Sequence, residues 1–152
     1  MLLPNPQPLT DFVWASPENR RLSTGISLSL IRSCREDVIR LDVLIRGGTW
    51  HQKKCLQAVL TNRMLREGTL RQDSSEIAIA LDHCGAALEQ SATATHCILT
   101  LYCLRKHFAK LLDVVHDMLN CPTFNEKQFR TVIDMNKQNT IISNRQVDMM
   151  AH

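Results

Sequence analysis

The chain has 152 residues, 44% of them hydrophobic and 22% charged, which is typical of a folded domain and not of a disordered segment. Its net charge is +3 with acidic and basic residues interspersed, and this argues against a nucleic-acid-binding surface. The sequence has no apolar run near the roughly 18 residues of a membrane helix, and its first residues lack the features of a secretory signal. We therefore expect a cytoplasmic protein without a membrane or nucleic-acid partner.

The cysteines and histidines do not form a metal-binding pattern. None of the six histidines makes a His-x-x-x-His pair, and the six cysteines lack the paired spacing of zinc sites. We expect no metal site from these residues, and we expect reduced, mostly buried thiols. The cysteines are Cys34, Cys55, Cys84, Cys97, Cys103 and Cys121.

The first third of the chain predicts an arm followed by two strands. Residues 1–21 contain four of the five prolines and predict an irregular arm, with the folded domain at 22–152. Ile26, Leu28 and Leu30 alternate with serines, which predicts a half-buried strand. A second strand at 39–46 is expected to pair with it as a hairpin. The face of this second strand that is expected to meet the helices consists of Ile39, Leu41, Val43 and Ile45.

The rest of the chain predicts four helices and two more strands. Helical spacing predicts a helix at 52–67, and Ser74 or Ser75 is expected to cap a second helix that ends at Gly85. Two antiparallel strands follow, and then an amphipathic helix and a last helix that begins at Asn125. The ranges of these strands and of the amphipathic helix are 86–92, 95–104 and 108–119. The order β-β-α-α-β-β-α-α predicts an α+β fold, an antiparallel sheet with helices packed on one face.

The most informative segment is residues 58–69, Ala-Val-Leu-Thr-Asn-Arg-Met-Leu-Arg-Glu-Gly-Thr. It resembles the zinc-binding helix of the pitrilysin/insulinase family of metallopeptidases, which carries His-x-x-Glu-His followed by Gly-Thr. Val59, Asn62 and Arg63 stand at the three motif positions. Val59 and Arg63 lie four residues apart and share one helix face, as the two histidines of the motif do.

Other segments resemble the same family in the same order. Leu22-Ser-Thr-Gly-Ile26 resembles its opening strand, and residues 81–88 resemble its Leu-x-x-x-Gly-Ala-x-Leu turn. Asn120-Cys-Pro-Thr-Phe-Asn125 resembles its link between helices, and Gly48-Thr49-Trp50 resembles a bacterial, Bacteroides-type class that includes non-catalytic members. The resemblance implies the N-terminal domain of the family, present in part.

The resemblance also implies that the catalytic residues are absent. The third zinc ligand of the family is a glutamate on the last helix, and Asn136 stands there. Valine has no lone pair, arginine is a permanent cation, and an asparagine at position 62 cannot take a proton from water. A family asparagine that contacts the peptide substrate falls at Glu89, which becomes a candidate peptide-binding residue.

Three functions remain open from the sequence. The first is an inactive homologue or subunit that stabilises an active partner of the same family, or that self-associates, with no cofactor. The second is an active zinc metalloendopeptidase with other ligands. The third is a stand-alone module that binds peptides by β-augmentation. For the first function, Trp14 in the arm is the expected interface residue.

Overall fold

The computed structural model describes residues 15–32 and 37–150, except for the side chains of 143–150. The chain divides into two compact units, residues 1–36 and 37–152. Trp14 and Cys34 therefore lie outside the described residues.

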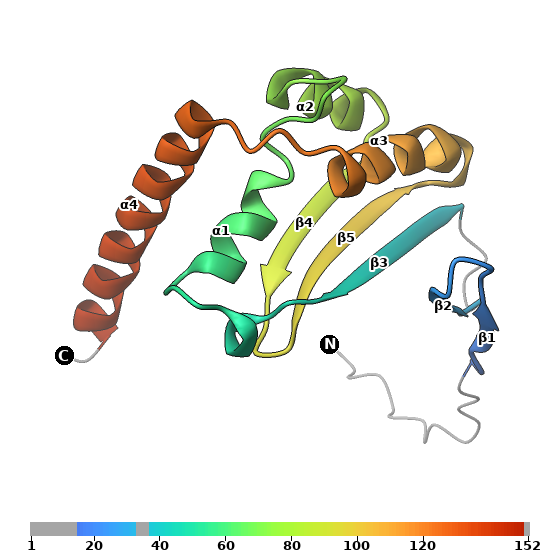
Figure 1. Cartoon of the computed structure of the whole chain (residues 1–152), viewed down its shortest axis with the longest axis horizontal. Helices are drawn as coiled ribbons and strands as arrows, with labels where there is room; N and C mark the ends of the chain where they lie inside the picture. The colour runs from blue at the N-terminus through green and yellow to red at the C-terminus, as the bar shows by residue number, and fades with distance from the viewer. Residues whose placement is uncertain (1–14, 33–36, 151–152) are drawn as a thin grey trace, which may run out of the picture. The chain divides into compact units, whose positions relative to one another are not determined.

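The first unit contains one small hairpin, in which β1 (Glu18–Arg21) pairs antiparallel with β2 (Ser27–Leu30) (Figure 1). The turn closes where the Gly25 amide donates to the Leu22 carbonyl at 2.9 Å, with Gly25 at φ +87°. Every residue of the two strands is exposed. Residues 18–21 were expected in the irregular arm, and 27–30 were expected to be half-buried and paired with the next strand. All three expectations are wrong, because the glycine turn pairs β2 with the segment that precedes it.

The second unit is a three-stranded antiparallel sheet with four helices (Figure 1). The strands stand in the order β3-β5-β4, and β5 lies between the other two. This confirms the predicted α+β class, with one strand more than expected at the start. In chain order the elements are β3 (Val38–Arg46), α1 (Gln57–Met64), α2 (Ser74–His83), β4 (Ala87–Ala92), β5 (His96–Leu104), α3 (Phe108–Asn120) and α4 (Glu126–Met150), with short 3-10 turns at Thr49–His51 and Arg105–His107.

The core lies between one face of this sheet and the helices α2 and α3. Leu99 and Leu101 of β5 are completely buried, and they pack in one cluster with Ile77 of α2 and with Leu111 and Met118 of α3. From β3, the alternating residues Ile39, Leu41 and Val43 pack against the same cluster, which confirms the predicted inward face. Ile45, at the end of that face, is 36% exposed.

Two helices begin at other residues than expected. α1 begins at Gln57 and not at residue 52, because Leu56 has a left-handed backbone at φ 64° that interrupts a helix. α2 is capped by Asp73 and not by Ser74 or Ser75. The Asp73 carboxylate accepts from the Glu76 amide at 2.8 Å, and the Glu76 carboxylate accepts from the Asp73 amide at 2.9 Å, which is a capping box.

The described cysteines carry free thiols. Cys84, Cys97 and Cys103 are buried as expected, Cys121 is half-buried and Cys55 is exposed. Burial raises the pKa of the Cys97 thiol above its usual value of 9.0. Burial, and secondarily the nearby Cys84, raise the pKa of Cys103 in the same direction. The thiols of Cys97 and Cys103 are therefore uncharged at neutral pH and behave as small apolar side chains.

Val43 and Leu44 are neighbours on opposite faces of β3 and provide a test of this packing. Val43 packs against the core beside fully buried Leu99, whereas Leu44 is 61% exposed. We expect Val43→Asp to lower the free energy of unfolding by about 3 kcal/mol, because it brings a carboxylate into an apolar cluster. Leu44→Asp should cost less than about 1 kcal/mol. Urea denaturation of both variants measures the difference, and equal losses would contradict the assigned face.

Candidate functional site

The residues predicted to stand at the family's metal-binding positions lie on two neighbouring helices, α1 and α4 (Figure 1). Arg63 of α1 and Asn136 of α4 are both half-buried and meet directly, since Arg63 Nη1 donates a hydrogen bond to Asn136 Oδ1. Asn136 Nδ2 in turn donates to the Val132 carbonyl of its own helix at 2.9 Å. Two positions 73 residues apart in sequence are thus joined by one polar bond across the two helices.

Asn62 has a different role from its neighbour Arg63. It is 3% exposed, and its amide Nδ2 donates to the carbonyls of Ser91 at 2.7 Å and Ile98 at 3.3 Å, on β4 and β5. In return, Gln90 Nε2 donates to the Asn62 backbone carbonyl. Asn62 therefore attaches α1 to the sheet, and its side chain does not join the Arg63–Asn136 pair.

The amide of Asn62 can have only one orientation in these surroundings. The reversed amide would place its oxygen against two carbonyl oxygens, which repel it. With the amide nitrogen on the strands, Oδ1 is buried and is the only buried side-chain polar atom in the described part of the chain without a hydrogen-bond partner. No sequence pattern indicates this role, because the pattern does not show which way the side chain of residue 62 turns.

A zinc ion does not fit the residues at these positions. Val59, one turn before Arg63, has no donor atom, and the Arg63 guanidinium repels a cation where a ligand would stand. Asp134, the nearest carboxylate on α4, is exposed and pairs with Lys137 at 3.8 Å. In the described ranges, no group of three or more His, Cys, Asp or Glu side chains is placed to hold a metal ion.

Glu89, the candidate peptide-binding residue, is exposed on β4, opposite Thr100 of β5. β4 forms one edge of the described three-stranded sheet. The side chain of Glu89 is therefore placed on an edge strand, where an added peptide strand would run, and its role in peptide binding stays a prediction.

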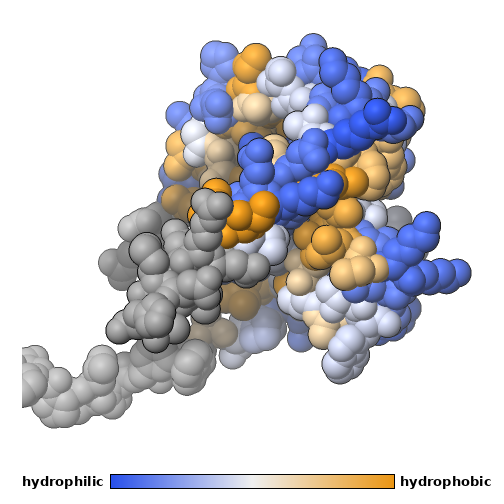
Figure 2. All heavy atoms as spheres, turned by 90° about the vertical axis from the view of Figure 1, so that its left-hand side faces the viewer, coloured by the Kyte–Doolittle hydropathy of each residue, from blue (hydrophilic) through white to orange (hydrophobic). Residues whose placement is uncertain are grey.

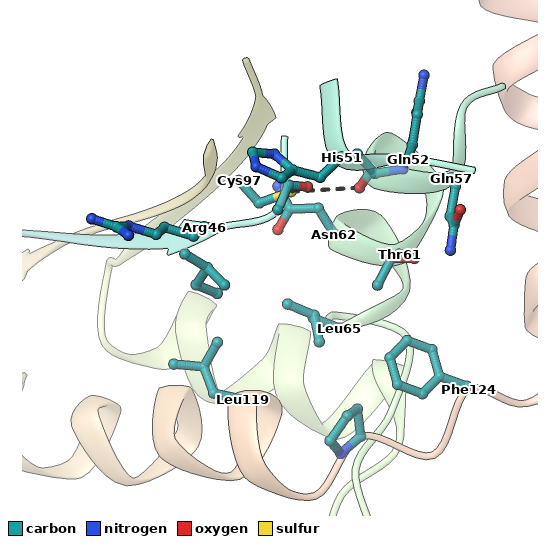
Figure 3. Close-up of a pocket in the computed structure, with 14 residues that line it drawn as sticks. Arg46, His51, Gln52, Gln57, Thr61, Asn62, Leu65, Cys97, Leu119 and Phe124 are labelled. Atoms are coloured by element: carbon teal, nitrogen blue, oxygen red, sulfur yellow. Dashed lines mark hydrogen bonds between the residues drawn. The ribbon is translucent and has the colours of Figure 1, made fainter. Parts of the chain in front are cut away.

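A hollow of about 470 Å³ lies beside α1 (Figure 3), and neither Val59 nor Arg63 lines it. We call it the Asn62 hollow. Ala58, Thr61 and Leu65 line it from α1; at about 100° per residue they occupy the helix face turned away from positions 59 and 63. Sequence reasoning did not find this hollow. Its other lining residues are Ile45, Arg46, Gly47, His51, Gln52, Gln57, Asn62, Cys97, Leu119, Pro122 and Phe124.

Two comparisons relate the chain to known proteins. The family model described as Insulinase (Peptidase family M16) matches residues 30–151. The crystal structure of a peptidase M16 inactive domain from Pseudomonas fluorescens matches with a TM-score of 0.73 and 18% sequence identity. That match covers 79% of this chain and 30% of the other, so the chain spans under a third of that relative, and at this identity the likeness shows the fold alone. No curated protein matches the chain.

None of the described helices is long and apolar enough to cross a membrane. The elements from β3 to α4 all fall within the range that the family model matches, as do Val59, Asn62, Arg63 and Asn136, the residues predicted to stand at the positions of the zinc motif. The chain belongs to the insulinase family, peptidase family M16.

Proposed function

We propose that this chain is a non-catalytic domain of the M16 family that acts by binding an active member of the same family. The observation that carries the proposal is the Arg63–Asn136 hydrogen bond. It joins the helices α1 and α4 at two positions where the family places zinc ligands. In this proposal a polar bond between two side chains has replaced the metal ion as the link between these helices.

The chemistry of position 62 supports the same proposal. The family's glutamate at this position activates a zinc-bound water, which requires a group that accepts a proton. The amide of Asn62 does not accept one, and its nitrogen is bonded to the carbonyls of Ser91 and Ile98. The residues at the motif positions thus provide neither the ligands for a metal ion nor a general base.

We expect the purified chain to show no peptide hydrolysis that a zinc chelator inhibits. A mixed peptide library, sampled by mass spectrometry with and without a zinc chelator, measures this. An M16 peptidase with an intact His-x-x-Glu-His motif, assayed in parallel, serves as the positive control. Hydrolysis by this chain that zinc restores after chelation would mean that other residues hold a metal, and it would favour the active-peptidase alternative.

Exposed apolar side chains support the partner role. Trp50 is 78% exposed and Leu70 is 77% exposed, and large exposed apolar groups of this kind often become buried in protein interfaces. Figure 2 shows the α4 side of the chain, where hydrophobic atoms interrupt a polar surface. Among the α4 side chains that the structure describes, the large exposed apolar ones are Phe129, Met135, Ile141 and Ile142.

We expect the chain to form a complex with an M16 homologue that carries the intact motif, or to self-associate when it is alone. Sedimentation velocity at micromolar concentration, with and without such a homologue, measures both. Trp50→Ser is expected to weaken the association, and Thr61→Ser provides a matched control within the same unit. A compact monomer that does not bind the homologue would contradict the proposal.

A second candidate function is peptide binding by β-augmentation, and the edge position of β4 favours it. The free edge of such a strand offers backbone donors and acceptors to an extended peptide. Two results together would support this second function over the first. The chain would sediment as a monomer, and it would bind extended peptides that the Ser91→Pro variant no longer binds.

A further inference from the structure

The Asn62 hollow lies on the face of α1 that carries Asn62 and Leu65, not on the face that carries Arg63, and a buried polar atom of Asn62 lies beside it. Most of its lining is apolar, contributed by α1, β3, the end of α3 and the segment that follows α3. Figure 3 shows Asn62 on one side of the hollow, with Leu65, Leu119 and Phe124 on the other. Small-molecule sites have this composition, an apolar wall with a few placed polar groups, and volumes of about 300–1,000 Å³.

The polar atom beside the hollow is a hydrogen-bond acceptor, the side-chain oxygen of Asn62. This oxygen is buried and has no hydrogen-bond partner, while the nitrogen of the same amide has two. In Figure 3 the oxygen is turned toward the hollow. A buried acceptor without a donor costs about 1–3 kcal/mol, so a group that brings a donor to it would recover that energy.

Besides Asn62, the polar lining residues are Arg46, His51, Gln52, Gln57, Thr61 and Cys97, and apolar groups cover most of the lining. Its thiol, Cys97, is protonated at neutral pH, because burial raises its pKa, and it donates to the carbonyls of Gly47 and Ala58. The guanidinium of Arg46 extends away from the hollow in Figure 3. No carboxylate lines the hollow.

We propose that the Asn62 hollow binds a small, uncharged and largely apolar molecule that carries one N–H or O–H group. The donor of this molecule bonds to Asn62 Oδ1, and its apolar body packs against Ile45, Leu65, Leu119 and Phe124. Because less than 1 Å² of Oδ1 is open in the empty hollow, binding includes a small displacement of a lining side chain. The site is independent of metal chemistry and of the partner proposed above.

Indole and 1-methylindole test the proposal on the unaltered chain. They have nearly the same shape and apolar surface, but only indole carries an N–H donor. We expect indole to shift the ¹⁵N–¹H resonances of Ala58, Leu65 and the Asn62 side-chain amide in a saturable titration. We expect 1-methylindole to bind at least about 10-fold more weakly, the ratio that one lost hydrogen bond gives. Equal binding of the two compounds, or no shift at these residues with millimolar indole, would overturn the proposal.

A pair of substitutions on α1 locates the binding. Ala58→Leu fills the hollow from the helix, and Val59→Leu adds bulk about 100° around the same helix, at a residue that does not line the hollow. Indole binding is expected to weaken at least about 10-fold in Ala58→Leu and to stay within about 2-fold in Val59→Leu. Equal binding to both variants would place the indole elsewhere and overturn the assignment. If Ala58→Leu does not fold, the comparison of the two indoles decides alone.

Discussion

The triple substitution Val59→His, Arg63→His and Asn136→Glu is expected to create a zinc site in this chain. Arg63 and Asn136 already meet across α1 and α4, and Val59 stands one turn before Arg63 on α1. Two imidazoles and a carboxylate at these positions form the three-ligand set of a catalytic zinc site, with water as the fourth ligand. Calorimetry should show one zinc per chain with a Kd of about 1 µM or lower, and no binding by the parent chain.

Two controls make this result specific. Omitting Asn136→Glu removes one ligand and should weaken zinc binding by at least about 10-fold. Affinity should also fall below about pH 6.5, because the imidazoles bind zinc only when they are neutral. A triple variant that is folded by circular dichroism and yet binds no zinc would contradict the placement of α1 against α4.

Replacing Asn62 by leucine should destabilise the chain by about 2–4 kcal/mol, a large share of the stability of a small domain. The substitution removes the donor to the carbonyls of Ser91 and Ile98 and puts an aliphatic group in its buried place. Asn62→Asp should cost at least as much, since a carboxylate would face two carbonyl oxygens. Urea denaturation measures both variants.

Thr61→Ala provides the matched control, because Thr61 is the preceding residue on the same helix and is exposed. It should change stability by less than about 0.5 kcal/mol. Losses of similar size at positions 61 and 62 would show that Asn62 does not attach α1 to the sheet. The same reasoning predicts that adding Asn62→Glu to the triple zinc variant lowers stability, because the longer carboxylate must leave the strand carbonyls.

Much of the fold could be predicted from local patterns. The alternation in β3 and β5 and the apolar spacing of α3 are strong signals, because each element buries one continuous face. The pairing of β2 was predicted wrongly, since alternation says which face is apolar and not which strand lies beside it. The turn at Gly25 decided the pairing, and its effect depends on a positive φ that no hydrophobic pattern records.

The candidate site was likewise predicted only in part from the sequence. The resemblance to the family aligned Val59, Arg63 and Asn136 with the zinc ligands, and Arg63 and Asn136 do meet in the structure. The role of Asn62 could not be predicted, because its partners are backbone carbonyls, which every residue carries. The Asn62 hollow was missed for a related reason. Its walls come from α1, β3, α3 and a connecting segment, and only the folded chain brings them together.

The bond between Arg63 and Asn136 also constrains how this chain can change over evolutionary time. Arg63→His alone would leave the Asn136 oxygen without its donor, and Asn136→Glu alone would pair a carboxylate with arginine and strengthen the link. A return to metal binding would therefore need changes on two helices that bring no benefit one at a time. Among relatives without the histidines, residues 63 and 136 should vary as a pair.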